Sequence, residues 1–136
     1  MKIVIDTNIL FSALLSKETS LRKTLFSRDN YFYSPNFVVA EIFKHKERIL
    51  KYSKSEESDV YEFLNSILKK INFVNEDFIS IENWQEAFRL CSDIDQKDTP
   101  FVALALELNA MLWTGDNKLK RGLIAKGFNS FFVPDF

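Results

Sequence analysis

The sequence predicts an α/β fold of three layers, α/β/α, with a mostly parallel central sheet of about five strands. Short continuous runs of β-branched and aromatic residues, typical of strands buried on both faces, alternate along the chain with longer segments of helical periodicity. The chain has 136 residues, of which 46% are hydrophobic, with only three glycines and three prolines. This composition predicts one densely packed domain over residues 1–136.

The first half of the chain alternates strand and helix. Lys2–Ile5 is a β-branched run, and Asp6 follows with a side chain that can cap a helix with one apolar face over residues 9–14. A helix over residues 20–28 precedes the aromatic strand 31–33, which a Ser-Pro-Asn turn closes. Apolar residues at helical spacing then predict helices over residues 37–51 and 55–70.

The second half continues the alternation. Residues 71–74 form a short expected strand, and Ile81–Cys91 has helical spacing. Pro100 suits the first turn of a helix, and the apolar run that follows it predicts a central, buried helix. Met111–Trp113 is the next expected strand. A basic helix over residues 117–126 ends at a glycine, and a last strand is expected at 131–133.

Composition excludes several classes of chemistry. Lys and Arg number 18 against 19 Asp and Glu, so the net charge is −1 and any binding of nucleic acid must be local. A single cysteine, Cys91, excludes a disulfide framework, and a single histidine, His45, excludes two-histidine catalysis. Oxygen ligands remain. The charged start of the chain and the lack of a long apolar run predict no signal peptide, no membrane contact and a cytoplasmic location.

Four acidic residues occupy positions that suit a shared site: Asp6, Glu41, Asp98 and Asp116. Asp6 and Asp116 each follow an expected strand, and ligands of open α/β sheets bind at the carboxyl ends of strands. Taken singly, each aspartate can be a helix cap, and Glu41 can be a solvated helix residue. Four converging carboxylates repel one another, however, so such a cluster requires Mg²⁺ or Mn²⁺.

These residues resemble those of a PIN domain, the small nuclease fold of VapC-type toxins in bacterial and archaeal toxin-antitoxin pairs. The resemblance lies in residues 3–10, the Glu41 helix, residues 98–105 and residues 112–119. It implies a Mg²⁺- or Mn²⁺-dependent endoribonuclease with Asp6, Glu41, Asp98 and Asp116 as catalytic acids. One or two ions are expected on Asp6, Asp98 and Asp116. Asn8 is expected to orient Asp6, and Thr114 to support the site by a hydrogen bond.

Some assignments remain open at this stage. Asp95 lies three residues before Asp98, so either could be the closer ligand, and Asp95 can also be a solvated loop residue. His45 is expected at the surface or facing a partner rather than in catalysis. A PIN-like module that binds RNA or a protein without catalysis is the alternative function. A phosphoaspartate enzyme fits less well because Asp6 lacks the second aspartate of that pattern.

Local basic segments and partners complete the prediction. Two segments carry a net charge of +3 each, and both directly follow a proposed site acid, which favours an RNA track. Their candidate RNA-binding residues are Lys44, Lys46, Arg48, Lys118, Lys120 and Arg121. The resemblance also implies a homodimer and a cognate antitoxin protein that blocks the site, as in type II toxin-antitoxin pairs.

Overall fold

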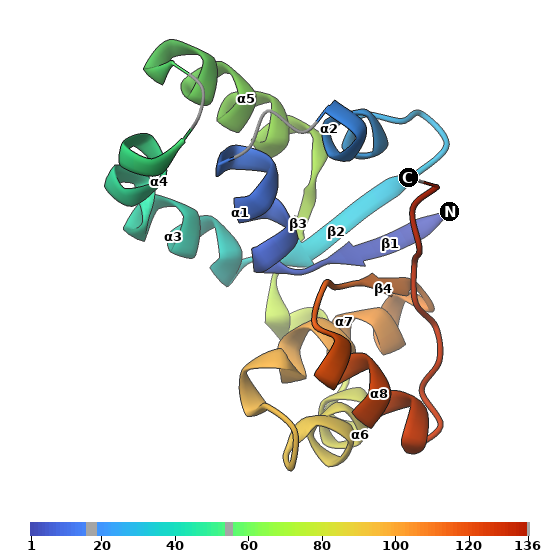
Figure 1. Ribbon diagram of the computed structural model, residues 1–136. Helices are drawn as coiled ribbons and strands as arrows, with labels where there is room; N and C mark the ends of the chain where they lie inside the picture. The colour runs from blue at the N-terminus through green and yellow to red at the C-terminus, as the bar shows by residue number, and fades with distance from the viewer. Residues whose placement is uncertain (16–18, 54–55, 136) are drawn as a thin grey trace.

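Four parallel strands form the central sheet of the computed structural model within residues 1–15, 19–53 and 56–135, which are the residues the structure describes (Figure 1). In the order β3-β2-β1-β4 across the sheet, they are β3 (Asn72–Val74), β2 (Tyr31–Pro35), β1 (Lys2–Ile5) and β4 (Met111–Trp113). Val4 lies opposite Tyr33 on one side and Leu112 on the other. Since all pairs are parallel, the carboxyl ends of the strands meet at one edge.

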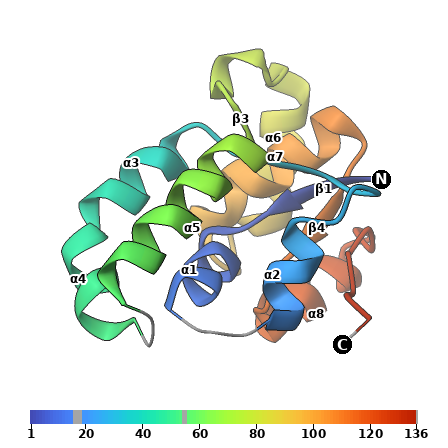
Figure 2. The same ribbon diagram turned by 90° about the horizontal axis from the view of Figure 1, so that it is seen from above.

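Helices cover both faces of the sheet, as Figures 1 and 2 show. One layer contains α1 (Thr7–Leu15), α2 (Thr19–Leu25), α3 (Phe37–Lys44), α4 (Lys46–Tyr52) and α5 (Glu57–Lys70). The other contains α6 (Ile81–Cys91), α7 (Thr99–Leu108) and α8 (Asn117–Ala125), and the short 3₁₀ helices η1 (Glu76–Phe78) and η2 (Gln96–Asp98) precede α6 and α7. The predicted three-layer α/β fold is confirmed.

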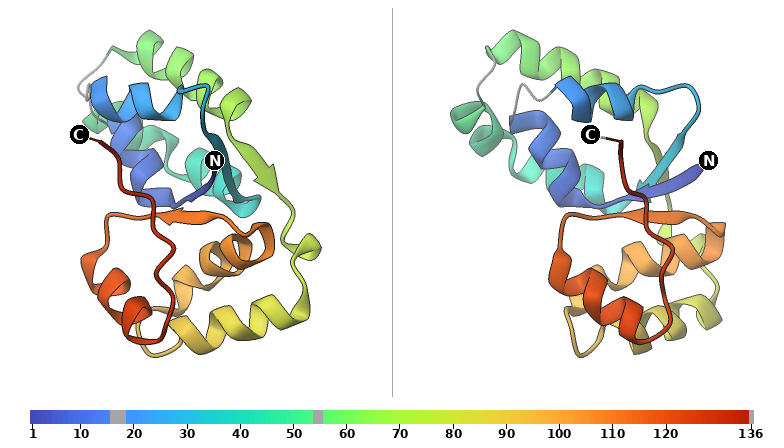
Figure 3. Two further views of the ribbon diagram at one scale, coloured as in Figure 1. Left: turned by 90° about the vertical axis from the view of Figure 1, so that its right-hand side faces the viewer. Right: turned by 45° about the vertical axis from the view of Figure 1, so that its right-hand side comes forward.

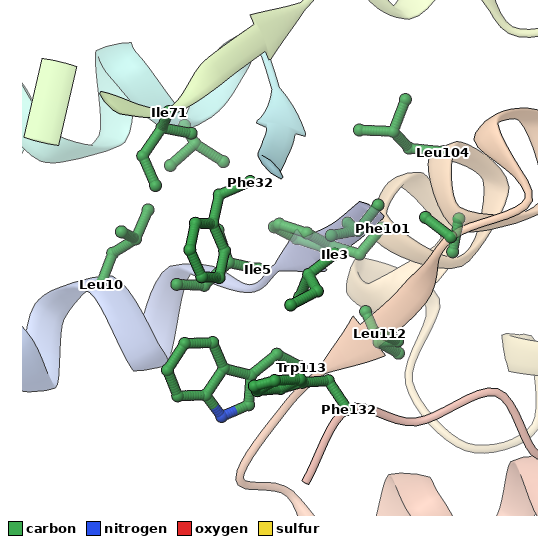
Figure 4. Packing of buried hydrophobic residues seen from close by; sticks show 14 of the residues in the cluster. Ile3, Ile5, Leu10, Phe32, Ile71, Phe101, Leu104, Leu112, Trp113 and Phe132 are labelled. Carbon is green, nitrogen blue, oxygen red and sulfur yellow. The ribbon is translucent and has the colours of Figure 1, made fainter. Parts of the chain in front are cut away.

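The core lies on both sides of β1, whose residues Ile3, Val4 and Ile5 have no exposed surface (Figure 4). Helix α7 packs against β1, β2 and β4, and residues 101–105 are all buried, as expected for a helix that is apolar nearly all round. On the other side of the sheet the Trp113 ring lies 5.9 Å from that of Phe32 and 5.1 Å from that of Phe132. Each such buried side chain stabilises the fold by about 1.5–3 kcal/mol.

The sheet differs from the prediction in its strand count. The expected fifth strand at 131–133 is a single bridge, in which Phe131 pairs with Leu112 while the tail runs past β4 (Figure 3). Leu112 donates to the Ser130 carbonyl and accepts from the Phe132 N–H, both at 2.9 Å. The ladder then stops because Pro134 has no N–H to donate.

Two helices also differ from their predicted bounds. The helix expected over residues 37–51 breaks at His45, whose φ of −101° and ψ of 12° lie outside the helical range, so it becomes α3 and α4. The helix expected to reach residue 28 ends at Leu25. The next helix was predicted to start at Ser55, which lies outside the described residues; α5 is described from Glu57. Across the described ranges, no helix is both long and apolar enough to cross a membrane.

Candidate active site

The strand order brings Asp6 and Asp116 together. β1 and β4 are neighbours in the sheet, and each leads directly into a loop that carries one of the two aspartates. The Asp6 backbone N–H donates to the Trp113 carbonyl at 3.2 Å, so the segments that follow β1 and β4 are still hydrogen-bonded where they leave the sheet. The site therefore begins at the carboxyl ends of β1 and its neighbour β4.

Asp6 is the most buried of the acids, with 7% of its surface exposed. Burial raises the pKa of its carboxyl, and the nearby charge of Asp116 raises it further. Hydrogen bonds from Thr114 and from backbone N–H groups oppose that rise, and Oδ1 accepts the bond from the Ile9 N–H at 2.9 Å. One of these backbone donors is Asn8, which thus approaches Asp6 through its main chain, while its side chain is exposed.

Thr114 links the two aspartates. Its side chain is buried, its hydroxyl hydrogen-bonds to the Asp6 carboxylate, and its Oγ1 accepts the Asp116 backbone N–H at 3.2 Å. Asp116 itself is exposed and caps α8, since its Oδ1 accepts the Leu119 N–H at 3.0 Å. This single threonine therefore fixes the loop after β4 against the loop after β1.

Asp98 is half-buried at the start of α7, and its side chain makes no capping hydrogen bond. Burial raises the pKa of its carboxyl to about 6, with further contributions from the charges of Asp95, Asp6 and Asp116. Helix capping thus accounts for one oxygen each of Asp6 and Asp116 and for none of Asp98. The three aspartates are close enough to repel one another.

An open cleft joins these carboxylates to α3. It is lined by Asp6, Thr7, Asn8, Phe11, Phe37, Glu41, Lys44, Asp95, Lys97, Asp98 and Phe101. Glu41 lies on α3, where its Oε2 is 3.6 Å from the His45 Nε2, an ion pair when the imidazole is protonated. Asp116 does not line the cleft, although its charge acts on Asp6 and Asp98. Asp95 is exposed and caps η2 by accepting the Lys97 N–H at 3.0 Å.

The donor set suits a hard divalent cation in its chemistry, because the clustered groups are all carboxylates, and burial together with their mutual repulsion raises the pKa of Asp98. As the side chains are placed, no three carboxylate, imidazole or thiolate groups within the described ranges are close enough to hold one ion. An ion bound here would therefore draw the carboxylates closer together and relieve their repulsion.

Sequence reasoning missed five residues of the cleft, of which Thr7 lies between Asp6 and Asn8. Lys97 lies between Asp95 and Asp98, and Phe11, Phe37 and Phe101 add aromatic walls. The rings of Phe37 and Phe101 meet edge to face with centroids 5.7 Å apart. Phe37 lies one helical turn before Glu41, and Phe101 lies one turn after Asp98. This spacing along the helices could have indicated that both rings lie beside the site acids. Their apolar character assigned them to the core instead.

The candidate RNA-binding residues occupy four places. Lys44 lines the cleft, Arg48 lines a neighbouring groove, and the Lys46 Nζ lies 5.6 Å from the centroid of the Tyr61 ring on α5. The other three, Lys118, Lys120 and Arg121, lie on α8 and do not line the cleft.

Three further lysines, Lys51, Lys54 and Lys126, were counted in the net charge of the basic segments. Lys126 is engaged elsewhere, because its Nζ donates to the carbonyls of Arg89 and Leu90 and to the carboxylate of Asp93. Lys54 lies outside the described residues.

A parallel α/β sheet with carboxylates clustered beside the carboxyl ends of β1 and β4 defines the class of protein, an α/β domain with an acidic centre suited to oxygen-bound divalent cations. Within that class the chain belongs to the PIN domain family, whose model matches residues 4–130, and the resemblance expected from the sequence is confirmed.

A solved structure has a similar fold. It is a chain in the crystal structure of VapBC2 from Rickettsia felis bound to a DNA fragment from their promoter, with a TM-score of 0.60. The two chains are 22% identical over 89% of this chain and 92% of that one. No curated protein matches the chain significantly.

Proposed function

We propose that this chain is a Mg²⁺- or Mn²⁺-dependent endoribonuclease that hydrolyses RNA phosphodiester bonds. Asp6, Asp98 and Asp116 hold the one or two ions, and Glu41 completes the catalytic acids from the opposite side of the cleft. The observation that carries this proposal is the half-buried Asp98 carboxylate, which has no capping role and lies within the field of three other aspartates. Perturbed carboxylates gathered in a cleft are typical of functional sites.

The residues around the acids suit a polyanionic substrate. Lys44 and Lys97 line the same cleft and can attract phosphate groups toward carboxylates that would otherwise repel them. Thr114 holds Asp6 in place, and the capping bonds of Asp6 and Asp116 fix the direction of both side chains. A bound divalent ion supplies Lewis-acid chemistry for phosphodiester hydrolysis. Asp95 is proposed as a supporting acid, because its charge contributes to the raised pKa of Asp98.

Cleavage of single-stranded RNA with added Mg²⁺ or Mn²⁺ tests the proposal. We expect the parent chain to cleave, EDTA to abolish cleavage, and Asp6→Asn to lower the rate by about 100-fold or more. Asp77→Asn, an exposed aspartate on η1 outside the cleft, is the matched control and should cleave like the parent. Equal rates for Asp6→Asn and the parent would show that the assigned metal site is wrong.

A PIN-like module that binds RNA or a protein without catalysis is the second candidate. It is favoured by one observation, that no three ligand groups in the described ranges are close enough for one ion as placed. Calorimetric titration separates the two candidates. Binding of Mn²⁺ to the parent and its loss in Asp98→Asn support the nuclease, whereas RNA binding without metal binding supports the silent module.

We further propose that the chain is the toxin of a type II toxin-antitoxin pair, with a protein antitoxin as partner and a homodimer as its assembly. The support is the PIN family membership together with the fold shared with a chain of the VapBC2 complex. Expression of the chain alone should arrest growth, and Asp6→Asn should not. Co-expression of the protein encoded by the neighbouring reading frame should relieve the arrest, and light scattering of the purified chain reports its assembly.

A further inference from the structure

A groove adjoins the carboxylate cleft between α1 and α4, which lie side by side (Figure 1). Two rows of side chains form this α1/α4 groove: Asn8, Phe11 and Leu15 from α1, and His45, Arg48, Ile49 and Tyr52 from the start of α4 onward. Asn8 and Phe11 also line the carboxylate cleft, so the two hollows share a wall. A ligand that fills the cleft and extends along α1 enters this groove.

The second row continues the face of Glu41. His45, Arg48 and Tyr52 are separated by three and four residues and line the groove together, and the Glu41 Oε2 on α3 lies 3.6 Å from the His45 Nε2. The row therefore runs from an acid of the proposed catalytic set, through an imidazole and a guanidinium, to an aromatic ring. The Phe11 ring meets the His45 imidazole edge to face at 5.7 Å and closes the row against α1.

The groove combines apolar side chains, among them Leu15 and Ile49, with the cation Arg48 and the aromatic ring of Tyr52. Arg48 is exposed, and no carboxylate of the described residues forms an ion pair with it. Tyr52 has 62% of its surface exposed, and the Lys51 Nζ lies 5.3 Å from the centroid of its ring. An exposed ring beside unpaired positive charge is the arrangement that binds single-stranded nucleic acid, in which bases stack and phosphates meet cations.

We propose that the α1/α4 groove is a subsite for a nucleotide of single-stranded RNA that lies next to the cleaved phosphate. Tyr52 stacks on the base, and Arg48 contacts the adjoining phosphate. The inference rests on the proposed function, because it places the remainder of the strand whose phosphate occupies the carboxylate cleft. Continuity with that cleft and the exposed Arg48 guanidinium beside the Tyr52 ring favour RNA over a protein segment as its occupant.

Binding of a labelled single-stranded RNA oligonucleotide of random sequence, followed by fluorescence anisotropy, tests the subsite. EDTA is present throughout, so that metal-dependent cleavage does not consume the RNA. Tyr52→Ala should weaken binding by about 5- to 100-fold, while Tyr52→Phe should bind like the parent because it keeps the ring. Tyr31→Ala, at 58% exposure on β2, is the matched control and should leave binding unchanged.

Salt dependence separates the phosphate contact from stacking. Arg48→Ala should reduce the slope of log affinity against log salt concentration by about 0.7, the value for one phosphate contact on a single strand. Tyr52→Ala should leave that slope unchanged. Arg28→Ala, an exposed arginine outside the groove, is the control for loss of a general positive charge.

The outcomes separate this inference from the nuclease proposal. RNA binding that depends on Tyr52, in a chain that cleaves nothing with Mg²⁺ or Mn²⁺, supports the subsite and overturns the nuclease. Cleavage by the parent with unchanged RNA affinity in Tyr52→Ala and Arg48→Ala overturns the subsite, and the groove is then a face for a protein partner. Failure of the parent to bind the RNA also overturns it. Circular dichroism confirms that each variant is folded.

Discussion

Replacing Asp98 by asparagine should stabilise the fold while removing a proposed metal ligand. Its carboxyl is half-buried, and burial together with the charges of Asp95, Asp6 and Asp116 raises its pKa from 3.8 to about 6. At neutral pH the folded chain must keep this group ionised against those effects. Asp98→Asn is nearly isosteric, so it removes the charge with little change in packing.

The magnitude follows from the pKa. A rise from 3.8 to about 6 corresponds to about 3 kcal/mol, at about 1.4 kcal/mol per pH unit. Because the side chain is only half-buried, solvent screening reduces this to about 1–1.5 kcal/mol. For a chain of this length, that gain raises the melting temperature by about 3–5 °C.

The sign of the pH dependence is fixed by the direction of the shift. Since the folded-state pKa lies above the unfolded value, the folded chain binds the proton more tightly between about pH 4 and 6. The contribution of this group to stability is therefore highest below pH 4 and falls as the pH rises through 6. The gain from Asp98→Asn should be full at pH 7 and absent near pH 4.

Thermal and urea unfolding of the parent and Asp98→Asn in EDTA measure the effect at both pH values. Asp135→Asn, an exposed aspartate near the end of the chain, is the control and should leave stability unchanged. Added Mg²⁺ or Mn²⁺ should stabilise the parent more than the variant, because only the parent keeps the full set of carboxylates. An Asp98→Asn variant no more stable than the parent at pH 7 in EDTA would refute the electrostatic reasoning.

Three further changes probe the support of the site and the core. Thr114→Val should lower metal affinity and RNA cleavage by about 10- to 100-fold, because it removes the hydroxyl that holds Asp6, and Thr114→Ser should restore both in a titration and a cleavage assay. Leu104→Ala should lower the free energy of unfolding by about 2–5 kcal/mol, measured in urea, since this side chain is 1% exposed on α7. Lys126→Met should lower it by about 1 kcal/mol, because two carbonyls near the end of α6 lose their donor, and a change within error would show that water replaces the lysine.

Much of the fold was predictable because the elements are marked by strong local patterns. The β-branched run before Asp6 and the apolar run after Pro100 each had one reasonable interpretation, and both formed as expected. The break at His45 was not predictable, because apolar periodicity continues across it and the change is confined to one residue's backbone. The fifth strand is reduced to a single bridge because Pro134 has no N–H to continue the ladder, and the apolar pattern of residues 131–133 does not indicate this.

For the candidate site, the sequence could identify the strand ends but not the partners of each carboxylate. The local pattern predicted that Asp6 and Asp116 each follow a strand. That these two strands are neighbours depends on strand order, which no local pattern in the sequence indicates. The absence of a capping bond at Asp98 is likewise a property of the folded chain. The roles of these residues in catalysis stay predictions until the substitutions are made.

The two walls of the cleft differ in their mechanical support. Asp6 and the loop that Thr114 fixes are anchored to the paired strands β1 and β4, so their amides should exchange with solvent only when the whole domain unfolds. Glu41 lies on α3, one helical turn before the break at His45. The amides of α3 and α4 should exchange through local opening, because these helices lie outside the sheet. The wall of the cleft that holds Asp6 is therefore expected to be rigid and the wall that holds Glu41 flexible. Any adjustment to substrates of different shape should then occur in α3 and α4.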